Sequence, residues 1–456
     1  MNLNENGKIK YYKGSRYNHF YTTNEGFLCY NSLTGLRCHI FEDNLVNQVK
    51  ELQDGATIDE ETIDERLVYA KIAVDTTLDE IILAQKQIAD ALQIHENTLR
   101  LIILPTRECN FRCVYCYEDK RTEYMKETQY EDIIQATKVY IEEHPAIKQL
   151  QIEWFGGEPL LCYDHIVYVS SELLQYCDEH GLSFNMAMTT NAYLLTKERA
   201  QKLLALHLYT YQITLDGLPQ THDTLRVLKN GSPTWNVIFQ NLKDINEIES
   251  QKLQITIRIN YHLGMLTTMR DFLVMLKENL DIGGKFLIYA IKITPPPHEN
   301  LPIDFVTAET ELMSTEFVFT LFSELGIPID TYKPNISPCE PVCYARKNNV
   351  FIIDTDGTLR KCTEFLEDNT VNNVGKLEHG RFIVNEDIHT LWLYPNPEML
   401  AEKKCYTCQD FPNCCGGLCP IQWLRDGMPS CNPMIPMIED MLRIEFENET
   451  MKSENS

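Results

Sequence analysis

Hydrophobic and polar positions in the middle of the chain switch repeatedly between a strand period and a helix period. Six short apolar runs with strand character follow one another from about residue 97: Leu99–Leu104, Leu150–Phe155, Ser183–Thr189, Thr210–Leu215, Leu253–Tyr261 and Lys285–Ile293. Between them, apolar residues recur at helical spacing, for example over 129–144, 165–181, 196–208 and 266–280. Six βα units in a row predict an α/β fold with a parallel sheet. Curved into an arc, this sheet would form a partial (β/α)6 TIM-like barrel, with its chemistry at the carboxyl ends of the strands.

The two ends of the chain have other patterns. Residues 1–95 predict a small α+β module, with strands around turns at 24–26 and 32–35 and a helix over 76–94. Three prolines at 295–297 mark a stiff boundary, and one more helix then precedes a cysteine-rich region that extends to residue 431. The predicted domains are therefore 1–95, 96–325 and 326–456.

Composition narrows the class of protein. The chain has 456 residues, 44% apolar and 23% charged, as expected of a folded globular protein. Its 66 acidic and 41 basic residues give a net charge of −25, which disfavours a nucleic-acid partner. The sequence contains neither a signal-peptide core at its start nor a run of 18 apolar residues. We therefore expect a cytoplasmic protein without a membrane partner.

The chain contains sixteen cysteines, and in a reducing compartment their clustering favours metal ligation over disulfides. Three lie at 109–116 and nine at 339–431. The other four, which we interpret as small buried hydrophobic residues, are Cys29, Cys38, Cys162 and Cys177.

The first cysteine group directly follows an apolar strand. Cys109, Cys113 and Cys116 have the spacing C-x3-C-x2-C, and no fourth cysteine or histidine lies close by in the sequence. A structural zinc site needs four ligands, whereas a 4Fe–4S cluster with only three thiolates leaves one iron open. This motif resembles that of the radical SAM enzymes. In that family the open iron binds S-adenosylmethionine, whose cleavage by one electron yields a 5′-deoxyadenosyl radical.

Other strand ends match the same family. The resemblance implies that residues from five positions bind S-adenosylmethionine: Tyr115, then Gly156, Gly157, Glu158 and Pro159 in "GGEP", Asn191, Asp216 and Arg258. Glycines permit a close approach to backbone, and an arginine can bind a carboxylate through two hydrogen bonds. A turn or helix cap would explain Asp216 equally well, so its role stays open.

The cysteine-rich region resembles the SPASM extension of radical SAM enzymes, which carries two auxiliary 4Fe–4S clusters. The matching residues are Cys343, Cys362, Cys405, Cys408, Cys414, Cys415, Cys419 and Cys431. By the family assignment, Cys405, Cys408, Cys431 and one of the pair Cys414/Cys415 hold one cluster, and the spacing of "CGGLC" favours Cys415. Cys343, Cys362 and Cys419 would hold the other, with one iron open unless Cys339 or the spare member of the pair binds it.

The resemblance implies three 4Fe–4S clusters, S-adenosylmethionine and a peptide substrate. We predict a radical SAM/SPASM peptide maturase that installs an intramolecular cross-link, a cysteine thioether as in sactipeptide and ranthipeptide maturases, in a ribosomally made precursor. The alternatives are a maturase that forms carbon–carbon cross-links and an anaerobic sulfatase-maturing, formylglycine-forming enzyme. In the latter case Glu364 is the candidate proton acceptor.

The implied partners are a precursor peptide with a leader and an electron donor such as flavodoxin or ferredoxin. Residues 1–95 have the size and place of a leader-binding module, and a structural cap on the barrel is the alternative reading. Two other classes explain less of the chain. An electron carrier would not need the six βα units, and a zinc-stabilised scaffold would account only for residues 405–431.

Overall fold

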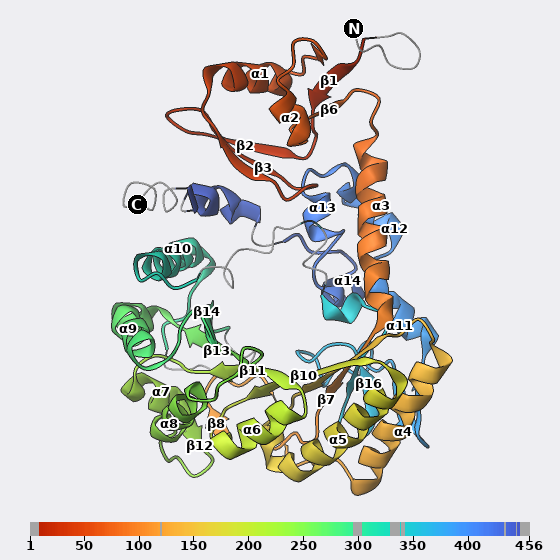
Figure 1. Ribbon diagram of the computed structural model, residues 1–456, viewed down its shortest axis with the longest axis vertical. Coiled ribbons are helices and arrows are strands. Elements are labelled where there is room, and N and C mark those ends of the chain that lie inside the picture. The colour runs from red at the N-terminus through yellow and green to blue at the C-terminus, as the bar shows by residue number, and fades with distance from the viewer. Residues whose placement is uncertain are drawn as a thin grey trace. The chain divides into compact units, whose positions relative to one another are not determined.

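The computed structural model describes residues 9–118, 121–294, 303–328, 338, 343–432, 435–443 and 445–446. The chain forms two compact units, whose elements are labelled in Figure 1. The barrel unit comprises Glu96–Tyr332 and Lys347–Thr390, and the smaller unit comprises Met1–His95, Lys333–Arg346 and Leu391–Ser456. In the described part of the chain, none of the helices combines the length and apolar composition needed to cross a membrane.

The barrel unit is built on six parallel strands, which confirms the predicted α/β fold. In sheet order they are β14 (Phe286–Lys292), β13 (Gln254–Tyr261), β11 (Leu208–Thr214), β10 (Ser183–Thr190), β9 (Gln149–Trp154) and β7 (Thr98–Ile103). Their limits lie within two residues of those predicted from the apolar runs. After the outermost strand, β14, the next helix in the described sequence is α10 (Ala308–Glu324).

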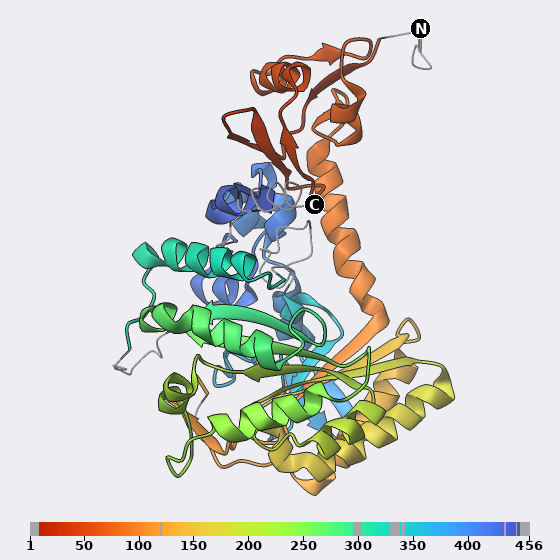
Figure 2. The same cartoon turned by 60° about the vertical axis from the view of Figure 1, so that its left-hand side comes forward.

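Helices cover one face of this sheet, as Figures 1 and 2 show. They are α4 (Glu127–Glu143), α5 (Tyr163–His180), α6 (Lys197–Ala205), α7 (Pro219–Leu225), α8 (Trp235–Asn246) and α9 (Met269–Asn279). The strands alternate accordingly: in β9, Leu150, Ile152 and Trp154 are buried, while Gln151 and Glu153 are only partly covered. The opposite, inner face of the sheet is therefore polar.

The sheet continues beyond β7 with residues from the predicted C-terminal region. β15 (Val350–Ile353) pairs in parallel with β7, and β16 (Thr358–Arg360), β17 (Gly375–Glu378) and β18 (Arg381–Val384) follow as antiparallel strands. Cys362, which comes two residues after β16, thus belongs to the barrel unit. The predicted domain limits do not coincide with the two compact units, and they stay a prediction.

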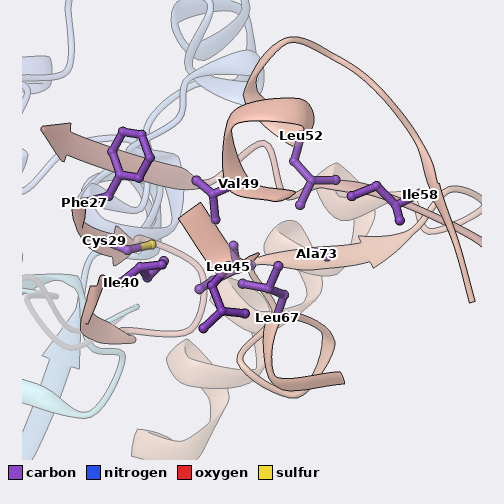
Figure 3. Close-up of a cluster of buried hydrophobic side chains, with 10 residues drawn as sticks. Phe27, Cys29, Ile40, Leu45, Val49, Leu52, Ile58, Leu67 and Ala73 are labelled. Atoms are coloured by element: carbon purple, nitrogen blue, oxygen red, sulfur yellow. The ribbon is translucent and has the colours of Figure 1, made fainter. Parts of the chain in front are cut away.

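The smaller unit begins with the predicted α+β module. One sheet contains β2 (Asn18–Thr22), β3 (Phe27–Asn31) and β4 (Arg37–Ile40), and the other contains β5 (Ile58–Asp59), β1 (Tyr11–Gly14) and β6 (Ala73–Asp75). With them are α1 (Asp43–Gln53), α2 (Glu65–Tyr69) and α3 (Glu80–Gln93). Figure 3 shows the apolar core of this module, in which the Cys29 side chain lies among aliphatic residues.

The same unit contains most of the C-terminal cysteines. They lie on or near α12 (Pro397–Glu402), α13 (Phe411–Cys414) and α14 (Pro420–Asp426), while α11 (Glu386–Leu393) leads into this segment from the barrel unit. Tyr17, Ala84 and Ile88 of the N-terminal module share one buried cluster with Cys405 and Cys415. Two regions far apart in the sequence therefore form a single core.

Candidate active site

The three cysteines of the C-x3-C-x2-C motif lie in a loop at the carboxyl end of β7, which we call the cysteine loop (residues 105–125). Its two ends are joined by backbone hydrogen bonds of 2.9 Å from Arg107 N to Glu123 O and from Met125 N to Pro105 O. Further along, β8 (Phe111–Cys113) pairs with β12 (Arg226–Leu228), and Cys113 lies opposite Arg226. The loop is thus fixed at its base and near its middle.

The Glu108 carboxylate organises the residues around the first cysteine. One oxygen accepts hydrogen bonds from Cys109 N at 3.1 Å and Arg112 at 3.0 Å, and the other accepts from Thr122 at 2.9 Å and Lys229 at 3.1 Å. Burial by itself would raise the pKa of Glu108, but these donors outweigh it and lower the pKa to about 2. The residue is therefore a buried, fully bonded anion beside Cys109.

The two glycines after β9 pack directly on the backbone that precedes Cys109. A Cβ atom on Gly156 would lie 2.3 Å from the Thr106 carbonyl oxygen, and one on Gly157 would lie 2.3 Å from the Glu108 carbonyl oxygen. Gly156 also has φ +111°, a conformation that favours glycine. These contacts within the chain already require both glycines, whatever the bound cofactor requires.

The Glu158 side chain joins two strand ends. Fully buried, it accepts hydrogen bonds from Leu160 N at 3.0 Å, Thr190 Oγ1 at 2.7 Å and Asn191 N at 2.8 Å. Burial raises the pKa of its carboxyl, and these donors oppose the shift. Pro159 follows as the first residue of a short 3₁₀ turn that Glu158 caps. Within the described residues, Glu158 and Pro159 thus hold the ends of β9 and β10 together.

Asn191 lies next to the first cysteine. Its side-chain Nδ2 donates to Asn110 Oδ1 at 2.7 Å and lies 3.8 Å from the Cys109 sulfur, while its Oδ1 accepts from Tyr193 N at 3.0 Å. Burial raises the pKa of the Cys109 thiol, and the nearby carboxylate of Glu158 adds to this. A thiol in such surroundings becomes a thiolate when a metal cation compensates its charge.

The Tyr115 hydroxyl is the centre of a polar cluster that joins the cysteine loop to β11 and β13. It donates to the Asp216 carboxylate and accepts from Arg226 Nη1 at 2.9 Å and Asn260 Nδ2 at 3.1 Å. The other Asp216 oxygen accepts from Asn260 N at 2.8 Å. Burial raises the pKa of Asp216, and the charge of Arg226 opposes the shift.

Arg226 has an unused hydrogen-bond donor. Its Nε is buried and has no partner within the described part of the chain, although its guanidinium lies 5.7 Å from the centre of the Phe111 ring. A chain of hydrogen bonds from Asp216 N through His222 and Thr234 to the Arg226 carbonyl fixes its backbone. A buried guanidinium with a free N–H beside the cysteine loop fits an anionic group such as the carboxylate of S-adenosylmethionine.

Arg258 lies deeper on the inner face of the barrel. Its Nε donates to Asn260 Oδ1 at 2.8 Å, and its charge lowers the pKa of Glu364 against the larger effect of burial, which raises it. Glu118, at the end of the cysteine motif, is half-buried, and the loss of solvent around it raises its pKa to about 7. The structure therefore brings one arginine and two carboxyls with raised pKa values to the same polar side of the barrel.

The C-terminal cysteines are divided between the two units. Cys362 belongs to the barrel unit, and Cys339 lies outside the described residues. In the smaller unit, the charges of Cys405, Cys408 and Cys431 act on one another, and those of Cys405 and Cys408 act on Cys414. The Cys415 thiol instead donates to the Pro412 carbonyl at 3.7 Å. Cys343 and Cys419 are half-buried in the same unit.

A half-barrel with three thiols after its first parallel strand, and a buried arginine and aspartate beside them, defines the site of a barrel enzyme that binds an iron–sulfur cluster and a small cofactor with an anionic group. Residues 103–273 match the family model described as the Radical SAM superfamily, and this part of the chain is a radical SAM domain.

Three relatives illustrate the range of the similarity. The chain is 25% identical over 268 residues to an uncharacterized protein of Methanocaldococcus jannaschii, a match that covers 58% of this chain and 84% of that protein. It is 26% identical over 325 residues to the GTP 3′,8-cyclase of Clostridium botulinum, covering 68% and 93%. The match to the Fe-coproporphyrin III synthase of Methanosarcina barkeri is 32% identical but covers 27% of this chain and only 29% of that protein.

The fold recurs in a solved structure. The protein described as native anSMEcpe with bound AdoMet and a Cp18Cys peptide superposes with a TM-score of 0.57 at 17% identity, over 78% of this chain and 99% of that chain. At this identity the likeness shows a shared fold.

One residue that organises the site, Glu108, was not among the predicted site residues, although it lies next to Cys109 in the sequence. The available signal was a charged side chain close to the carboxyl end of a buried barrel strand, where few positions contact solvent. The sequence did not indicate which partners this side chain would find.

Proposed function

We propose that the chain is a peptide maturase that generates a 5′-deoxyadenosyl radical and installs an intramolecular cross-link, specifically a cysteine thioether, in a precursor peptide. The observation that carries this proposal is the arrangement of Cys109, Cys113 and Cys116 on a braced loop beside Arg226. When bound there, a 4Fe–4S cluster supplies the electron that splits S-adenosylmethionine into methionine and the radical.

The side chains of this chain would bind and orient the cofactor. The free Nε–H of Arg226 would bind its carboxylate, and Asp216 and Tyr115 would hold that guanidinium in place. The other predicted contacts, Gly156, Gly157, Glu158, Pro159, Asn191 and Arg258, remain part of the proposal. Among them, Asn191 is the residue whose amide lies next to the Cys109 sulfur.

In thioether formation, a carbon–hydrogen and a sulfur–hydrogen bond of the peptide break and a carbon–sulfur bond forms. The hydrogen atom ends on 5′-deoxyadenosine, the proton goes to a base, and one electron is returned for the one that cleaved the cofactor. Glu364 would accept the proton, because desolvation raises the pKa of its carboxyl.

The auxiliary clusters are also proposals. We infer that Cys405, Cys408, Cys414 and Cys431 hold one cluster. The charge of Cys431 acts on Cys405 and Cys408, and the charges of Cys405 and Cys408 act on Cys414, as does that of Cys415, whose thiol donates to the Pro412 carbonyl. This choice differs from the preference for Cys415 that the sequence spacing suggested. The second set, Cys343, Cys362 and Cys419, rests on the sequence spacing alone.

The polar inner face of the barrel favours a peptide substrate. Arg100 and Glu153 form an ion pair of 2.5 Å on neighbouring strands, and Tyr289 donates to Gln212 at 2.9 Å. Such side chains can exchange partners with peptide N–H and C=O groups, which carry both donors and acceptors. Residues 1–95 would bind the leader, and flavodoxin or ferredoxin would supply electrons.

Two alternatives within this class remain. A carbon–carbon cross-linking maturase would use the same radical site without a substrate thiol. A formylglycine-forming enzyme is favoured by the fold shared with anSMEcpe, whose solved structure contains a Cp18Cys peptide. Glu364 would then be the residue that accepts the proton.

A second candidate function concerns a nucleotide. Relatives named GTP 3′,8-cyclase match 68% of this chain. Incubation of the reduced enzyme with GTP and S-adenosylmethionine tests this candidate directly. Formation of 5′-deoxyadenosine that depends on GTP would replace the peptide proposal.

The decisive experiment is co-expression with a short cysteine-bearing peptide encoded beside the gene. Mass spectrometry should show a loss of two hydrogens per bridge, and the bridged cysteines should resist alkylation. A bridged product in which every cysteine is still alkylated would identify carbon–carbon chemistry. An unmodified peptide, in cells whose purified enzyme still cleaves S-adenosylmethionine, would overturn the peptide assignment.

A further inference from the structure

The segment that carries Cys362 and Glu364 is bonded to the cysteine loop through buried charges. Arg107, two residues before Cys109, donates to Asp354 through Nε at 2.8 Å and Nη2 at 2.5 Å. Arg360, two residues before Cys362, donates to the same carboxylate at 2.7 Å. Arg107, Asp354 and Arg360 are each less than 5% exposed. The carboxyl ends of the parallel strands β7 and β15 are thus joined by one carboxylate.

A second carboxylate binds both ends of the cysteine loop. Glu367 accepts from Arg107 Nη1 at 2.8 Å and from Arg121, which comes after the last cysteine. The Glu367 side chain is 44% exposed and that of Arg121 is 39% exposed, so this contact lies at the edge of the buried group. Together, Asp354 and Glu367 connect the segment 354–367 to the loop at two arginines, Arg107 and Arg121.

The segment between these carboxylates is itself rigid. The buried Asn372 side chain accepts from Lys361 N at 2.9 Å and Cys362 N at 3.0 Å, and it donates to the Cys362 and Phe365 carbonyls at 2.8 and 2.9 Å. Both the N–H and the carbonyl of Cys362 are thus bonded to Asn372, so the segment moves as a unit. Its movement relative to the cysteine loop requires breaking the charged contacts of Asp354 and Glu367.

We propose that Arg107, Asp354 and Glu367 are positioning residues that fix the distance between the radical-generating cysteine loop and the segment of Cys362 and Glu364. This inference rests on the proposed function, in which Cys362 holds an auxiliary cluster. Buried, doubly bonded guanidinium–carboxylate pairs are rigid in direction as well as distance. These pairs thereby hold the cysteine loop and the segment of Cys362, which are separate in sequence, in a fixed relative position within the barrel unit.

The test uses the full-length protein, purified without oxygen and reconstituted with iron and sulfide. Glu367→Gln removes both charged contacts of a half-exposed side chain, and Asp354→Asn removes the buried ones. Glu378→Gln is the matched control, because it breaks an exposed 2.7 Å ion pair with Lys376 on β17 of the same sheet. Cys362→Ala provides the reference without the auxiliary cluster.

The first measurement is amide hydrogen exchange. In Glu367→Gln we expect peptides from 105–125 and from 361–372 to exchange at least threefold faster, while peptides from β10 and β11 keep their rates. Glu378→Gln should leave both segments unchanged. The proposal would be overturned if both segments exchanged at wild-type rates in Glu367→Gln and also in Asp354→Asn, whatever the iron content.

The second measurement is the microwave-power saturation of the reduced cluster signal, which depends on the distance to a neighbouring paramagnet. Power at half-saturation should fall at least twofold in Glu367→Gln, toward the value of Cys362→Ala. Wild-type saturation in Glu367→Gln, together with altered saturation in Cys362→Ala, would show that these residues do not set the distance. Unchanged iron content in Cys362→Ala would refute the auxiliary cluster at Cys362, which is a part of the proposed function. The hydrogen-exchange result alone would then decide whether Asp354 and Glu367 hold the two segments together.

Discussion

At the scale of single residues, the cysteine loop is held by a few side chains that each make several hydrogen bonds. Glu108 accepts four hydrogen bonds, two from Cys109 and Arg112 within the cysteine motif, one from Thr122 after it and one from Lys229 after β12. Tyr115 accepts two and donates one. Each hydrogen bond to a charged group contributes about 1.5–3 kcal/mol when its partner is present. The shape of the cysteine loop thus depends on these few side chains.

We predict that Glu108→Gln weakens cluster binding. The amide keeps the size of the carboxylate but cannot compensate Arg112 and Lys229, so the free energy of unfolding should fall by about 2 kcal/mol. Iron bound at the cysteine loop should fall at least twofold, as measured by iron content and absorbance near 400 nm in a variant that also lacks Cys405. Glu249→Gln, at an exposed position far along the same unit, serves as the control. Full iron occupancy in Glu108→Gln would contradict this role.

At the scale of elements, the six parallel strands were predictable because each carries apolar residues at strand spacing and is separated from the next by a stretch with helical spacing. β15 to β18 were not assigned to this sheet, because β15 pairs with β7 across some 250 residues of sequence. The run Val350–Ile353 has the composition of a buried strand but carries no information about its neighbour. Likewise, "GGEP" indicated a close backbone approach, but the sequence did not show that Gly157 faces Glu108 of this chain.

Gly157→Ala should therefore disturb the cysteine loop without touching a cysteine. The new Cβ would lie 2.3 Å from the Glu108 carbonyl oxygen and 2.7 Å from that of Arg107, so the backbone must move. Overpacking of this kind costs about 1–3 kcal/mol, and we expect reduced iron binding and slower formation of 5′-deoxyadenosine. Gly181→Ala is the control, because that Cβ would meet no atom within 4 Å and only the φ of +68° is unfavourable. Equal effects of both variants would argue against a specific contact.

The packing of α11 on β15 predicts a pH dependence of stability. His389 is buried, which lowers its pKa to about 4, and the charge of Lys361 at 3.3 Å contributes. Because the folded state disfavours the protonated form, this contribution to stability is complete above pH 6.5 and is lost as the pH falls toward 4. Across this pH range the free energy of unfolding falls by up to about 3 kcal/mol.

Urea unfolding under anaerobic conditions at pH 7 and pH 5 measures this effect. The difference between the two midpoints should shrink in His389→Gln. His379→Asn replaces an exposed histidine on the turn after β17 and should keep the wild-type difference. An unchanged pH dependence in His389→Gln would assign the effect to other groups.

At the scale of the whole molecule, the sequence predicted the cysteines as groups but not the compact units that contain them. The N-terminal module and the segment of Cys405 and Cys415 share one buried cluster, while Cys362 belongs to the barrel sheet. Loss of a cluster from the smaller unit should therefore leave the radical site intact. Likewise, loss of the cluster at the cysteine loop should leave the cluster of the smaller unit in place.

Iron counting tests this independence. If three 4Fe–4S clusters are present, the wild type should hold about twelve irons per chain. Cys405→Ala should lose about four of them and still form 5′-deoxyadenosine from S-adenosylmethionine and dithionite. Replacing Cys109, Cys113 and Cys116 together by alanine should also lose about four, but it should abolish 5′-deoxyadenosine. Cys29→Ala, which alters a buried thiol of the N-terminal core, should keep all irons. A wild type with about eight irons would limit the C-terminal cysteines to one cluster, and loss of cleavage in Cys405→Ala would show that the two sites depend on each other.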